Sequence, residues 1–154
     1  MLLPLFYRTM MGSAVTNAKY EVKVKLQGLE QSGRQGKKDI LVTNNPMASI
    51  QYHSRFLIDF KDTNTLGILT RVRNLIHKGH RLLTHPLSGS IKPNETMYKS
   101  VLITGISGIP DPQSVTIIEE SVLTAQKFQE KEIPEKYLHD MQVIDLALIN
   151  DAIK

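Results

Sequence analysis

The sequence predicts an α/β fold, a single small domain in which a mostly parallel sheet is flanked by helices. Its 154 residues suffice for one domain with a proper core, and 41% hydrophobic with 22% charged residues is ordinary for a globular protein. From residue 39 onward, short apolar runs are interspersed with segments of helical periodicity. The predicted order is strand, strand, helix, strand, strand, helix, helix, which is typical of α/β layers.

The first 36 residues differ from the rest and predict an N-terminal extension. Residues 1–38 hold seven Lys/Arg and two Asp/Glu, a net charge of +5, whereas residues 39–154 hold twelve and thirteen, a net charge of −1. Residues 27–38 contain three glycines among polar residues and predict a linker. Residues 20–26 alternate apolar and polar, so the extension is either disordered or contributes one edge strand. We place the boundary near Gly36, with the α/β domain at residues 37–154.

Composition excludes several classes of function. The chain has no cysteine, which removes disulfides, thiolate nucleophiles and cysteine-ligated zinc, and we expect neither a metal nor another cofactor. The excess positive charge lies in the extension, so no nucleic-acid-binding face is expected. No apolar run approaches the ~18 residues of a membrane helix, and the start "MLLPLFY" lacks the basic residues of a secretory signal. We therefore expect a cytoplasmic protein without a membrane partner.

The first half of the domain predicts strands around one helix. Residues 39–45 form an apolar run ended by Asn-Asn-Pro, which predicts a buried strand that runs into a turn. Residues 54–60, 80–86 and 98–106 predict three further strands. Between the second and third strands, "DTNT" offers oxygens that could cap a helix, and apolar residues follow at helical spacing. Gly79 suits the left-handed position that ends this helix.

Two helices are expected to complete the domain. Asp111 and Pro112 suit the cap and the first residue of a helix that continues over residues 113–131, although β-branched residues near its start weaken helix propensity. Residues 135–153 predict a final amphipathic helix. Its apolar side is expected to consist of Leu138, Met141, Ile144, Leu148 and Ile149.

Two polar loops follow predicted strands and form the candidate site. If these strands are parallel neighbours, both loops meet at one edge of the sheet, where α/β proteins place ligand sites. The candidate ligand- or partner-binding residues are Asn44, Asn45, His85, Ser88, Gly89, Ser90, Lys92, Asn94 and Glu95. Residues 88–90 offer hydroxyl and backbone N–H donors to an oxyanion, and Lys92 offers a positive charge. The same residue types also form ordinary turns, so a plain surface connection is the alternative.

Three longer strings resemble the GrdX family. They are "DILVTNNP", "VRNLIHKGHRLLTHPLSGSIKPNETMYKSVLI" and "IPEKYLHDMQVIDLALI", and the resemblance covers about residues 37–154. This is a family of small proteins encoded alongside the glycine, sarcosine and betaine reductase components of amino-acid-fermenting anaerobic bacteria. Family members usually have a proline where this chain has Met97, which indicates a slightly different turn. The resemblance carries the family's central motif onto residues 85–95 and the Asn44–Asn45 turn.

The resemblance implies a role in glycine, sarcosine and betaine reductase metabolism. Since a chain without cysteine cannot carry the thiol chemistry of those reductases, it implies an accessory protein for binding, assembly or regulation. The partner would be a component of the reductase complex or a small anionic metabolite. The alternative is a small enzyme for a phosphate- or carboxylate-bearing metabolite, with His85 or Glu95 as acid–base and Lys92 as electrostatic stabiliser. The enzyme requires those three side chains around one cavity, and no catalytic residue is assigned.

Overall fold

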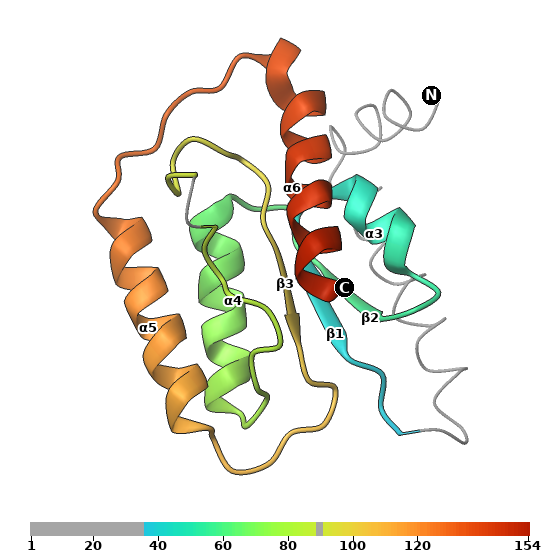
Figure 1. The fold of residues 1–154 in the computed structure, drawn as a ribbon. Coiled ribbons are helices and arrows are strands. Elements are labelled where there is room, and N and C mark those ends of the chain that lie inside the picture. The colour runs from blue at the N-terminus through green and yellow to red at the C-terminus, as the bar shows by residue number, and fades with distance from the viewer. Residues whose placement is uncertain (1–35, 89–90) are drawn as a thin grey trace.

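The computed structural model describes residues 36–88 and 91–154, which form three layers (Figure 1). One small sheet lies between two pairs of helices, with α4 and α5 on one face and α3 and α6 on the other. The elements are β1 (Ile40–Thr43), α3 (Pro46–Tyr52), β2 (Leu57–Phe60), α4 (Thr65–His77), β3 (Ser100–Ile103), α5 (Pro112–Gln126), a 3-10 turn η1 (Glu135–Tyr137) and α6 (Leu138–Ile153). The predicted α/β domain is therefore confirmed.

The sheet is mixed, which corrects the prediction of a mostly parallel one. Its strand order is β2-β1-β3, with β1 parallel to β2 and antiparallel to β3. Thr43, the last residue of β1, pairs with Ser100, the first residue of β3. The carboxyl end of β1 therefore lies beside the start of β3 and the loop that leads into it.

The strand predicted at residues 80–86 is reduced to one isolated bridge. Leu82 pairs antiparallel with Ile103, and the backbone N–H groups of Leu83 and Thr84 both donate to Leu102 O. The chain runs along β3 for these few residues and then turns back through the loop. Because the chain reverses direction in this loop, β3 runs antiparallel to β1. The pattern of apolar residues in the sequence does not indicate the reversal.

The Asn-Asn-Pro turn after β1 is the start of a helix that the sequence analysis missed. The Asn45 side chain accepts a hydrogen bond from Met47 N and caps α3, whose first residue is Pro46. Proline without an N–H fits the first turn of a helix, where that group has no partner in any case. Asparagine and proline are common both in turns and at the starts of helices, so the sequence alone does not distinguish a turn from a helix start at this position.

The other helix boundaries follow local signals. Asn64 caps α4, Asp111 caps α5 with Pro112 as its first residue, and Gly79 takes a φ of 101° after α4, all as predicted. Helix α5 ends at Gln126 instead of 131. On α6 only Asp145 and Ile149 are buried, and Ile144, predicted on the apolar side, remains 45% exposed.

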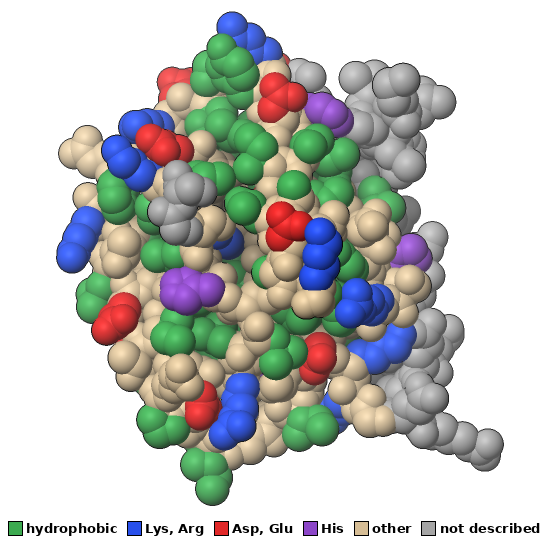
Figure 2. Space-filling model, viewed as in Figure 1, with side chains coloured by type: hydrophobic (Ala, Val, Ile, Leu, Met, Phe, Trp, Pro, Cys, Tyr) green, Lys and Arg blue, Asp and Glu red, His purple; other side chains and the backbone are tan. Residues whose placement is uncertain are grey.

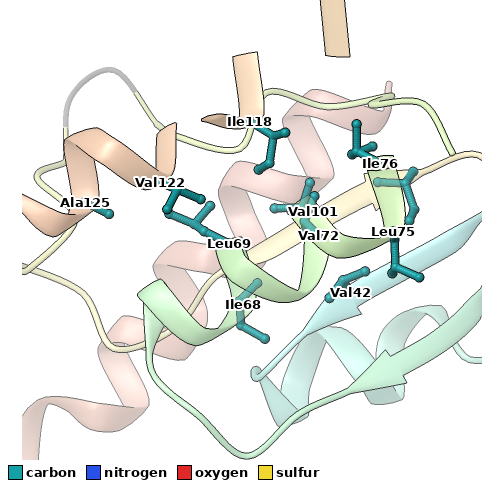
Figure 3. Close-up of a cluster of buried hydrophobic side chains, with 11 residues drawn as sticks. Val42, Ile68, Leu69, Val72, Leu75, Ile76, Val101, Ile118, Val122 and Ala125 are labelled. Atoms are coloured by element: carbon teal, nitrogen blue, oxygen red, sulfur yellow. The ribbon is translucent and has the colours of Figure 1, made fainter. Parts of the chain in front are cut away.

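Two separate cores fix the helices on the sheet. Successive residues of a strand point to opposite faces. Val42 and Val101 accordingly pack with α4 and α5 in one cluster, while Leu41 and Leu102 pack with α3 and α6 in the other. Figure 3 shows the first cluster, with side chains from both helices gathered against the two valines. The loop before β3 and helix α6 thereby meet at the carboxyl end of β1.

Candidate functional site

Asn44 joins the end of β1 to two other segments. Its side-chain Nδ2 donates to Thr63 O at 2.6 Å and to Met97 O at 2.7 Å, and its Oδ1 accepts from Lys99 N at 2.8 Å. The side chain is 2% exposed, and both of its donors and its acceptor are engaged. Asn44 therefore holds the loop against the sheet and presents no group to a ligand.

Asn45 turns inward as well and connects β1 to α6. Its Nδ2 donates to Gln142 O and to Asp145 Oδ2, each at 2.9 Å. Its Oδ1 accepts from Met47 N and caps α3. Asn44 and Asn45, which were predicted as binding residues, thus hold together the segments that surround the site.

Asp145 on α6 is the centre of a buried polar network. Ser100 N donates to its Oδ1 at 3.0 Å, and Ser100 Oγ donates to its Oδ2 at 2.7 Å, the oxygen that also accepts from Asn45. Thr43 Oγ1 lies 2.7 Å from Ser100 Oγ and extends the chain of hydroxyl groups into β1. Burial raises the pKa of Asp145, and the hydrogen bonds from Asn45 and Ser100 oppose that rise.

Lys99 lies beside this network with little compensation for its charge. The residue is 7% exposed, and its Nζ donates to Ser88 Oγ at 3.3 Å. No ion pair joins Lys99 to Asp145 among the described residues. Burial lowers the pKa of Lys99, and the nearby Asp145 carboxylate opposes this. An ammonium has three N–H donors, so among the described contacts two remain for another acceptor.

A small cavity opens between the loop and α6. It measures about 10 Å³, room for about one water. Ser88, Thr96, Tyr98, Lys99 and Asp145 supply its polar lining, and Leu87, Ile91, Pro93, Ile144 and Leu148 supply its apolar lining. The Tyr98 hydroxyl accepts from Gln142 Nε2 at 3.0 Å, and burial raises its pKa. Lys99 and Tyr98, both buried, therefore contribute to the lining of one small cavity.

The remaining predicted residues lie elsewhere on the loop. His85 is exposed, and its Nδ1 contacts the backbone of Leu87, two residues on. Lys92 and Glu95 are exposed too, and Gly89 and Ser90 lie outside the described residues. Asn94 lines a second cavity of about 270 Å³ and donates to Gln129 O at 2.8 Å. Neither cavity is lined by His85, Lys92 or Glu95, so the structure does not bring the three residues of the enzyme hypothesis together at either one.

Among the described residues, the face shown in Figure 2 has no extended patch of one charge. On the face shown in Figure 2, acidic and basic side chains are interspersed, with hydrophobic side chains between them. Attraction for an anion must therefore come from a nearby cation. Lys99 is the cation that the structure places beside Ser88, and Lys92 points outward from the same loop.

Sequence reasoning missed Lys99, Ser100 and Asp145, although a signal for two of them exists. Lys99 begins the apolar run that becomes β3, and Asp145 interrupts "VIDLALI" in α6. Lysine and aspartate are almost never fully buried unless they are paired, so a charge inside an apolar run is worth noting. The antiparallel direction of β3 determines which apolar segments come into contact.

Two negative findings concern the described part of the chain. Within residues 36–88 and 91–154, no group of three or more His, Cys, Asp or Glu side chains could hold a metal ion. None of the helices described there has the length and apolar character needed to cross a bilayer.

Comparisons with known proteins give one match. No curated protein and no solved structure matches the chain. The model of the GrdX-like protein family matches residues 40–154, the whole span from β1 to the C-terminus. This chain belongs to the GrdX-like protein family.

Proposed function

We propose that this protein is a cytoplasmic accessory protein of glycine, sarcosine or betaine reductase metabolism that binds a small anionic ligand at the Lys99 cavity. Membership of the GrdX-like family supports the metabolic context. The absence of cysteine supports an accessory role, because the chain cannot supply a thiol. A component of the reductase complex would then respond to the ligand-bound protein.

One observation carries the proposal: a buried ammonium faces a cavity with most of its donors unused. Removing an ammonium from water costs several kcal/mol unless close partners replace the water. The Lys99 ammonium has one described hydrogen bond, and the oxygens of Asp145 already accept from Ser100 and Asn45. An anion in the cavity would complete the hydrogen bonding of Lys99 and offset the cost of its burial.

The enzyme alternative has less support from the geometry. It places acid–base chemistry on His85 or Glu95 and charge stabilisation on Lys92, yet these three residues line neither described cavity. The His85 ring also contacts the backbone of its own turn, an ordinary structural role. Binding at Lys99 requires no further catalytic group.

The test is a titration with small anions at constant ionic strength, followed by calorimetry and thermal unfolding. The panel contains inorganic phosphate, sulfate, formate, acetate and butyrate as sodium salts. At least one anion should bind the parent protein, and Lys99→Met should weaken that binding about tenfold or more, the equivalent of one charge-assisted hydrogen bond. Lys92→Ala is the matched control on the exposed part of the loop and should bind nearly as the parent does.

Two results would reject this function. Either no anion of the panel binds the parent protein, or Lys99→Met binds as tightly as the parent. If Lys92→Ala alone weakens binding, the anion sits on the exposed part of the loop and the Lys99 site is wrong.

A further inference from the structure

We infer that the ligand of the Lys99 cavity is a monocarboxylate with a short aliphatic tail. The inference rests on the proposed function, since it names the class of anion that this site accepts. Three properties of the cavity carry it: its charge, its donors and its apolar rim.

The charge of the site suits a single negative charge. Among the described residues that line the cavity, Lys99 is the one cation, and Asp145 lines it as well. Three donor groups point at the Asp145 carboxyl group and oppose the rise in its pKa that burial causes. A dianion would bring a second negative charge close to Asp145, and the described lining has no second cation to balance it.

The donors suit two ligand oxygens. Lys99 Nζ and Ser88 Oγ lie 3.3 Å apart, and because Ser88 accepts from Lys99 its hydroxyl hydrogen is free for another acceptor. The pair can thus donate to both oxygens of one carboxylate. Phosphate sites normally add an arginine fork or the N-terminus of a helix. The described lining of this cavity contains no arginine, and α6 contributes Ile144, Asp145 and Leu148 from its interior turns.

The size and rim of the cavity suit an aliphatic tail. The enclosed space admits about one water-sized group, so one oxygen of a carboxylate can enter it while the rest of the ligand stays outside. Leu87, Ile91, Ile144 and Leu148 belong to the apolar lining of the cavity. Ile144 is 45% exposed on a helix whose predicted apolar side includes it, and an aliphatic tail would cover it.

The chain length of the carboxylate provides the test. Dissociation constants are measured by calorimetry for formate, acetate, propionate and butyrate, and for phosphate and sulfate, at pH 7 and constant ionic strength. We expect affinity to rise about threefold to fourfold per added methylene while the tail remains on the rim. Sulfate and phosphate should bind at least about tenfold more weakly than butyrate.

Ile144 and Val143 provide a matched pair of variants. Both are β-branched, adjacent on α6 and almost equally exposed, at 45% and 44%, but only Ile144 lines the cavity. Ile144→Ser should flatten the chain-length series and leave formate binding unchanged. Val143→Ser should reproduce the series of the parent protein.

The outcomes separate this inference from the proposed function. If phosphate or sulfate binds as tightly as butyrate and Lys99→Met abolishes that binding, the anion site is correct and the monocarboxylate assignment is wrong. A flat series in the parent protein, or an Ile144→Ser series equal to that of the parent, also overturns the assignment. If nothing in the panel binds, the proposed function fails together with it.

Discussion

At the residue scale, the main feature of the molecule is a pair of buried charged residues, Asp145 and Lys99. Asp145, on α6, is 4% exposed, and Lys99, directly before β3, is 7% exposed. Asp145 lies on α6 but accepts hydrogen bonds from β3 and from the start of α3, so it ties three elements together. A buried network of this kind stabilises the fold only while every donor keeps its acceptor.

Asp145→Ala is therefore expected to destabilise the protein strongly. The substitution leaves Ser100 N–H and the Asn45 amide without their acceptor and removes the carboxylate near Lys99. A loss of about 3–5 kcal/mol in the free energy of unfolding is expected, as for other broken buried charge networks. Urea unfolding measures it. Asp151→Ala, on the exposed end of the same helix where Asp151 pairs with Lys154, is the control and should unfold as the parent does. Equal curves for the two variants would mean that the network contributes nothing to stability.

At the scale of single elements, the helix ends are where short sequence signals indicate the structure most directly. Gly79 closes α4 with a φ of 101°, and its N–H donates to Ile76 O. A Cβ at this position would lie 1.8 Å from Gly108 O, so the backbone conformation and the available space both require glycine.

Gly79→Ala should lower the free energy of unfolding by more than about 1 kcal/mol, because strain and a steric clash add to each other. Gly108→Ala is the control from the same contact, since a Cβ there would meet nothing within 4 Å. Chemical denaturation of the two variants gives the comparison. A Gly79→Ala variant as stable as Gly108→Ala would contradict the backbone geometry.

The cap of α5 should give a measurable pH dependence. The Ser114 hydroxyl and backbone N–H, with a smaller contribution from Arg81, hold the pKa of Asp111 below its ordinary value of 3.8. A lowered pKa in the folded state adds stability that is present above pH 3.8 and is lost as the pH falls through the lowered value. Asp111→Asn keeps a cap but cannot titrate. The difference in melting temperature between the parent and this variant should shrink below pH 3.8, and a difference independent of pH would contradict the assignment.

At the scale of the whole molecule, the α/β domain is expected to fold without residues 1–36. The entry to β1 makes its own contacts: Asp39 O accepts from Leu57 N, Asp39 Oδ1 accepts from Gly105 N, and Lys38 Nζ donates to Ser54 O. A chain that starts at Lys37 retains all of them and should keep its melting temperature and its cooperative unfolding in a thermal scan. Loss of cooperativity would show that residues 20–26 form an integral strand of the protein.

Local signals in the sequence determined the class of the fold and the ends of several elements. The alternation of apolar runs and helical periods predicted an α/β domain, and the capping residues placed the starts of α4 and α5 and the end of α4. These features depend on residues within a few positions of each other. A cap, a glycine in the left-handed region or a helical stripe needs no distant partner to be recognised.

Only the tertiary structure decided the direction of β3 and, with it, the composition of the site. The reversal after residues 81–84 places the start of β3 beside the end of β1 and under α6. Lys99 therefore meets Ser88 and lies near Asp145, which is 46 positions further along the chain. The sequence pattern predicted Lys92 as the candidate cation, whereas the proposed site has Lys99, because an exposed lysine and a buried lysine differ in their surroundings and not in the sequence itself. Burial depends on contacts between residues that are distant in sequence. Because Lys99 is buried, its ammonium has two N–H donors without a partner among the described contacts, and the residue lines a cavity.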